Sequence, residues 1–155
     1  MAVDDSSVRK SDPTQLRCAI VVAHPVHLFK LYGWVLRHRP VIHVLTNSAG
    51  TGPLGPIHTA ALLREFERTG ATSGEIFDIV SDAEIYRGLL EGDAGLFTRM
   101  TTKIAASFVR HRVELVVADA HEGCSAAHDL CRAISDGAVA IAGSELGRRS
   151  ESFAC

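Results

Sequence analysis

Histidines stand at two places where short apolar runs end. His24 and His27 follow the run from Cys18 to Ala23, and His128 lies in a polar stretch after a second run, residues 113–119. Imidazole is the commonest protein ligand for zinc and similar ions. Three protein ligands leave a fourth zinc position open for water, as in catalytic rather than structural sites. The residue types and their spacing therefore predict an open metal site.

The apolar runs are expected to be strands buried on both faces, as in a parallel sheet. Pro25 cannot donate to a strand ladder, so the first strand must end before it. Strands are expected over residues 18–23, 41–45, 75–80 and 113–119. Helices are expected over 28–39, 57–68 and 97–111, after a cap at Ser81 or Asp82, and up to Ala142. This alternation predicts an α/β fold with a Rossmann-like, doubly wound, mostly parallel sheet between two helical layers.

Chain topology explains how distant histidines would meet. In the strand order three-two-one-four, strands one and four are neighbours at the point where the winding reverses. The segments that leave their carboxyl ends are residues 24–27 and 121–128. Ligands bind at this position in open α/β sheets. We therefore expect both histidine groups to face one crevice.

Length and composition indicate one globular domain of 155 residues. We expect a flexible arm over residues 1–16, the domain over 17–143 and a polar tail over 144–155. The net charge of −2 gives no electrostatic case for nucleic acid binding. No apolar run is long enough to span a bilayer, and the N-terminal residues do not resemble a secretory signal, so a cytoplasmic protein with reduced cysteines is expected. The oligomeric state stays open, with a homo-oligomer as one alternative.

Four motifs, taken in order, resemble those of the LmbE-like, PIG-L type N-deacetylases. The motifs are Ala23-His24-Pro25, Thr46-Asn47, Arg64-x-x-Glu67 and Glu122-Gly123-x-x-x-x-His128-Asp129. The resemblance extends over residues 18–142. It implies a Rossmann-like sheet and a hydrolase that uses Zn²⁺, or another divalent metal, to remove N-acetyl groups. The implied partner is a small N-acetylated amino sugar or glycoconjugate.

The resemblance also implies roles for individual residues. His24 and His128 fall on metal ligands of the family, and His27 falls on its ligating aspartate, which gives a site of three histidines. The substrate is expected to contact residues that follow the second strand and one on the next helix, namely Asn47, Ser48 and Arg64. Glu122 and Asp129 are expected to take part in catalysis.

One departure from the family pattern concerns the general base. The family's text is His-Pro-Asp-Asp, and its first aspartate, the base, falls on Val26. Valine cannot accept a proton, so Glu122 is the candidate replacement. A histidine that assists the reaction in some members falls on Ser125. Three functions therefore stay open: a zinc-dependent deacetylase, a catalytically impaired member of the fold that binds a metal or a ligand, or a scaffold without a metal.

A second metal site is also conceivable from the cysteines. His121, Cys124, His128 and Cys131 form a possible Cys₂His₂ set within eleven residues. This alternative would leave His24 and His27 without a role. A domain of this length also has enough core to fold without a structural zinc.

Overall fold

The computed structural model describes residues 16–47, 59–147 and 151–154. Within these residues the chain forms a five-stranded parallel sheet in the order β3-β2-β1-β4-β5. The strands are β1 (Cys18–Val22), β2 (Val41–Thr46), β3 (Thr72–Val80), β4 (Leu115–Ala118) and β5 (Glu151–Ala154). The predicted α/β fold and the predicted position of strand one between strands two and four are both confirmed.

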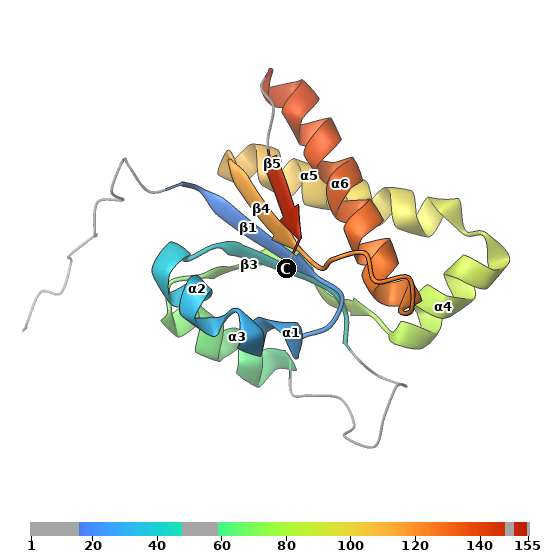
Figure 1. Ribbon diagram of the computed structural model, residues 1–155, viewed down its shortest axis with the longest axis horizontal. Helices are drawn as coiled ribbons and strands as arrows, with labels where there is room; N and C mark the ends of the chain where they lie inside the picture. Colours follow the sequence, from blue (N-terminus) through green and yellow to red (C-terminus); the bar gives the residue numbers. More distant parts are fainter. Residues whose placement is uncertain (1–15, 48–58, 148–150, 155) are drawn as a thin grey trace, which may run out of the picture.

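Helices cover both faces of the sheet (Figure 1). On one face lie α1 (His27–Lys30), α2 (Tyr32–His38) and α3 (Thr59–Arg68). On the other lie α4 (Asp82–Glu91), α5 (Ala94–His111) and α6 (Ala126–Leu146). The result is the expected three-layer arrangement. No helix among these elements is long and apolar enough to cross a membrane.

Strand β1 forms the centre of the sheet because every residue in it is apolar and buried. Successive strand side chains point to opposite faces. Ala19 and Val21 accordingly pack in the core beneath α5 and α6, whereas Ile20 and Val22 pack against α1, α2 and α3. Because β1 packs into the core on both faces of the sheet, its position is fixed. The backbone of the residues that follow it is therefore held in place at its carboxyl end.

Several elements differ from the sequence prediction. The single helix expected over 28–39 is two short helices, since Leu31 leaves helical geometry and its N–H bonds to Leu28 three residues back. Strand β3 begins at Thr72 rather than Glu75. The helix expected to end at about Ala142 continues to Leu146, and residues 151–154, for which no element is expected, add β5 to the open edge of β4.

Some predictions cannot be compared with the structure. The predicted arm over 1–16 lies outside the described residues, apart from Leu16, which is exposed. The loop expected over 47–56 also lies outside them, apart from Asn47.

Candidate metal centre

The carboxyl ends of β1 and β4 bring the three predicted histidines together. His24 follows β1 by two residues, and His27 begins α1 after a tight turn in which its N–H donates to the carbonyl of His24 at 3.2 Å. His128 lies in the first turn of α6, which follows β4. Because β1 pairs in parallel with β4, both segments leave the sheet at the same edge. The predicted convergence is confirmed.

The three imidazoles surround a common point. One nitrogen from each of His24, His27 and His128 lies within 4.8 Å of the other two. The ring centroids are 5.5, 5.3 and 4.7 Å apart, and the rings meet edge to face. Among the described residues this is the one group of three or more His, Cys, Asp or Glu side chains with metal-binding spacing.

The closest nitrogens have the separation expected of zinc ligands. His24 Nδ1 and His128 Nε2 are 3.3 Å apart. In a tetrahedral site with zinc–nitrogen bonds of ~2.0–2.1 Å, two ligand nitrogens lie about 3.3–3.4 Å apart. This pair therefore fits one edge of a zinc tetrahedron without rearrangement.

Each imidazole also contacts a carboxylate through its other nitrogen. His24 Nε2 is 3.1 Å from Asp82, His27 Nδ1 is 2.8 Å from Asp119, and His128 Nδ1 is 2.9 Å from Glu122. Carboxylates in such positions fix the orientation and tautomer of metal-binding histidines. A cation between the inner nitrogens would be held by three imidazoles that carboxylates orient from outside.

These contacts make a cation at the centre favourable. When the carboxylates hold the protons of His24 and His128 on the outer nitrogens, the inner nitrogens carry lone pairs. Two lone pairs facing each other at 3.3 Å repel. A metal ion or a shared proton between them removes that repulsion, so the donor set fits a divalent metal.

Burial keeps the electrostatics of the site suited to a metal. Burial lowers the pKa of His24 despite the opposing charge of Asp82, which favours the neutral imidazole that a metal requires. Burial opposes ionisation of Asp119, but hydrogen bonds from His27 and from the Ala23 N–H outweigh it and lower the pKa of this carboxyl. The neutral form of His24 and the ionised form of Asp119 are thus both favoured.

Glu122 and Asp129 occupy the loop before α6. The Glu122 carboxylate contacts His128 on the side away from the other two imidazoles. Asp129 accepts hydrogen bonds from the backbone N–H groups of Glu122 and Gly123, which lower the pKa of its carboxyl, and lies 3.7 Å from His121. These contacts shape the loop and orient His128. A catalytic role for either residue stays a prediction.

Val26 lies between two of the candidate ligands, His24 and His27, in the sequence. Its side chain is 47% exposed. Phe29, one turn further on, is 58% exposed, so this part of the turn into α1 presents an apolar surface.

The three residues predicted to contact the substrate are Asn47, Ser48 and Arg64. The Asn47 N–H donates to the carbonyl of Val80 at the end of β3, and Arg64 is an exposed residue of α3. Ser48 lies outside the described residues. Substrate contacts from these three residues stay predictions.

The cysteine-containing alternative is not assembled. The Cys131 thiol is buried in the core and donates to the carbonyl of Val21 at 3.5 Å. Cys124 is exposed and lies 3.7 Å from the Glu122 carboxylate. His128 belongs to the three-histidine group instead, so the four residues do not share a centre.

Sequence reasoning missed the contribution of Asp82 and Asp119. The sequence pattern indicates only a helix cap at Asp82 and only the end of a strand at Asp119. Both carboxylates are almost fully buried, and each follows a strand of the parallel sheet. An acidic residue at the carboxyl end of a buried strand was the available indication, because ligands bind at that edge.

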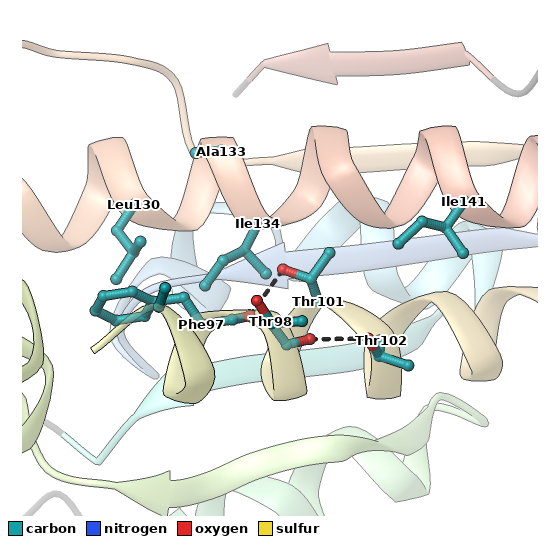
Figure 2. A pocket seen from close by; sticks show the side chains of 9 residues that line it. Phe97, Thr98, Thr101, Thr102, Leu130, Ala133, Ile134 and Ile141 are labelled. Atoms are coloured by element: carbon teal, nitrogen blue, oxygen red, sulfur yellow. Dashed lines mark hydrogen bonds between the residues drawn. The ribbon is translucent and has the colours of Figure 1, made fainter. Parts of the chain in front are cut away.

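A separate groove of about 450 Å³ lies between α5 and α6 (Figure 2). Phe97, Leu130 and Ile134 line it, and the hydroxyls of Thr101 and Thr102 donate to backbone carbonyls of their own helix. None of the three histidines lines this groove. The groove is therefore separate from the candidate metal centre.

Comparison with solved structures finds a similar fold in 4-carboxy-2-hydroxymuconate hydratase, GalB, from Pseudomonas putida KT2440. The TM-score is 0.51 and the sequence identity is 19%, over 90% of this chain and 62% of the hydratase. The chain thus spans less than two thirds of that protein. No family model matches the sequence, and no curated protein matches it. The likeness supports the α/β fold described above.

Proposed function

We propose that the chain binds one divalent metal ion, with zinc as the first candidate, through His24, His27 and His128. The observation that carries this proposal is the set of three inward nitrogens within 4.8 Å, each on an imidazole whose other nitrogen contacts a carboxylate. A bound zinc would polarise a carbonyl oxygen and lower the pKa of its water to about 7. Three histidines leave a coordination position for that water.

The reaction that we propose is hydrolysis of an N-acetyl group on an amino sugar or glycoconjugate. Support comes from the four motifs that resemble the LmbE-like, PIG-L type deacetylases and from the predicted site histidines, which lie together. In this reaction the three imidazoles would hold the metal, and the exposed surface at Val26 would lie beside the entering substrate.

A non-catalytic, ligand-binding role is the second candidate, and the carboxylates favour it. Asp82, Asp119 and Glu122 each contact an outer imidazole nitrogen. Val26 offers no proton acceptor. A general base must lie within hydrogen-bond reach of the water that it deprotonates. These three contacts hold the carboxylates at the outer nitrogens, away from the position between the histidines where a metal-bound water would lie.

Substitution of Val26 by aspartate separates the two candidates. General-base catalysis contributes typically ~10²–10⁴-fold, so a disabled deacetylase should gain activity on that scale in Val26→Asp. The assay is acetate release from N-acetylglucosamine and its glycosides with zinc present. Phe29→Asp is the matched control, because it adds the same charge to an exposed position one turn away.

The outcomes point in different directions. A gain in Val26→Asp alone, at unchanged zinc content, supports a deacetylase scaffold that lacks its base. No acetate release from either variant, with zinc still bound, supports the ligand-binding role. Fast release by the wild type, slowed in Val26→Asp, would show that another residue is the base, and Glu122→Gln would then be the next variant. Hydration of 4-carboxy-2-hydroxymuconate belongs in the same set of assays, because the structurally similar protein is named for that reaction.

A further inference from the structure

We infer that Asp119 is a positioning residue that holds the proton of His27 on Nδ1 and thereby turns a free Nε2 lone pair toward the metal position. The inference rests on the proposed metal site. It also assigns positioning roles to Asp82 and Glu122.

Both oxygens of Asp119 are used as acceptors. Oδ1 lies 2.8 Å from His27 Nδ1, and Oδ2 accepts the backbone N–H of Ala23 at 2.7 Å. The Asp119 side chain is 8% exposed, so water competes little for either oxygen. The N–H of Asp119 in turn donates to the carbonyl of Val21. This carboxylate therefore links β4 to the end of β1 and orients the imidazole that follows.

An ionised carboxylate accepts hydrogen bonds and cannot donate them. Since Asp119 accepts at Oδ1, the Nδ1 of His27 must carry the proton. The Nε2 of the neutral ring then has the lone pair that a metal needs. Asp119 thus sets the tautomer of His27 without being a metal ligand itself.

His24 is oriented the opposite way. Its Nε2 contacts Asp82, whose side chain is 1% exposed, so Nδ1 is the nitrogen that faces His128. Glu122, which contacts His128, is 45% exposed and is therefore open to competition from water. We expect the influence on metal affinity to be larger for Asp119 than for Glu122, because both oxygens of Asp119 are engaged and buried.

Asparagine at position 119 tests this role with little change of shape. An amide has one acceptor oxygen and one donor NH₂ group, whereas the site requires two acceptors. When the oxygen of asparagine accepts from Ala23, the NH₂ group faces His27 Nδ1. That contact favours a proton on Nε2, which blocks the metal-binding nitrogen.

The first experiment compares the His27 tautomer in the wild type and in Asp119→Asn. Long-range ¹H–¹⁵N correlation spectra of the full chain without metal, at about pH 8, report which nitrogen of His27 carries the proton. We expect the Nδ1–H tautomer in the wild type and a shift toward Nε2–H in Asp119→Asn. A wild type with the proton on Nε2 would overturn the inference, whatever the variant does.

The second experiment measures zinc affinity by competition with a chromophoric chelator. Loss of an outer hydrogen bond of this kind typically costs ~10–100-fold in metal affinity. We expect that loss in Asp119→Asn and a smaller one in Glu122→Gln. Asp93→Asn is the matched control, because Asp93 caps α5 by accepting from the Leu96 N–H and touches none of the histidines. It should bind zinc as the wild type does.

These results are distinguishable from failure of the proposed function. Wild-type zinc affinity in Asp119→Asn, in a protein that binds zinc, would overturn the inference and leave the metal site standing. A protein with the expected tautomer and affinity loss that never releases acetate would keep the inference and reject the deacetylase. Absence of zinc binding in the wild type would reject both.

Discussion

The stability of the chain should fall in mild acid because of one histidine outside the metal centre. His43 lies on β2 and is completely buried. Its Nδ1 accepts from the Ile76 N–H at 3.4 Å, its ring meets Phe108 edge to face, and its Nε2 has no hydrogen-bond partner among the described residues. Burial, with a smaller effect from His111, lowers the pKa of His43 from 6.5 to about 3. The folded state therefore holds this ring neutral.

The sign of the effect follows from where protons bind. Below pH 6.5 the unfolded chain takes up a proton at His43, whereas the folded chain does so only near pH 3. Stability increases with pH wherever the unfolded state binds more protons. The contribution of His43 is thus fully present above pH 6.5 and is lost as the pH falls toward 3. One proton corresponds to about 1.4 kcal/mol per pH unit, so the loss by about pH 4.5 is ~2.7 kcal/mol.

Urea denaturation between about pH 7.5 and 4.5 measures this loss, with a chelator present so that metal binding does not contribute. His43→Leu removes the titrating group, and the difference between wild type and variant should change by ~2.7 kcal/mol across that range. Val44→Ala is the control, since Val44 is a buried β2 neighbour without a titrating group. Its destabilisation should be independent of pH. If the difference in unfolding free energy between wild type and His43→Leu were also independent of pH, the conclusion that His43 is neutral in the folded state would be refuted.

Two further predictions concern packing and capping, and urea denaturation tests both. A Cβ at Gly74 would lie 2.3 Å from His43 Cε1, so Gly74→Ala should destabilise the fold by ~1–3 kcal/mol. Gly33→Ala in α2 meets nothing within 4 Å and should instead stabilise it by up to about 1 kcal/mol. Equal effects at the two glycines would contradict the packing of His43. Ser81→Ala removes the capping box of α4 and should cost ~1 kcal/mol, whereas Ser125→Ala should cost much less, because Ser125 makes no side-chain cap bond. Comparable losses would refute the cap assignment.

Much of the fold was predictable because each strand and helix has a local apolar pattern, and the alternation of these elements limits the topology. The buried run of β1 and the proline after it predicted a strand that ends at His24. The right strand order then followed from the alternation of strands and helices. Strand β5 was not predictable in this way, since four residues carry little pattern and its pairing depends on the open edge of β4.

The metal centre was predictable only in its histidines. The carboxylates that orient them lie 58 residues from His24 and 92 residues from His27 in the sequence. Local pattern assigns Asp82 to a helix start and Asp119 to a strand end. Their common role appears only when the parallel sheet brings the carboxyl ends of β1, β3 and β4 to the same side of the molecule. The tautomer of each ring is likewise a property of the folded contacts.

The most direct test of the metal centre is the zinc content of the full chain after equilibration with zinc and removal of the excess. Three convergent imidazoles predict about one equivalent for the wild type and the loss of most of it in His24→Ala. His121→Ala is the control, because this histidine is 71% exposed and lies outside the group of three. It should keep the metal. Zinc that survives His24→Ala but is lost in the double variant Cys124→Ala, Cys131→Ala would contradict the three-histidine centre.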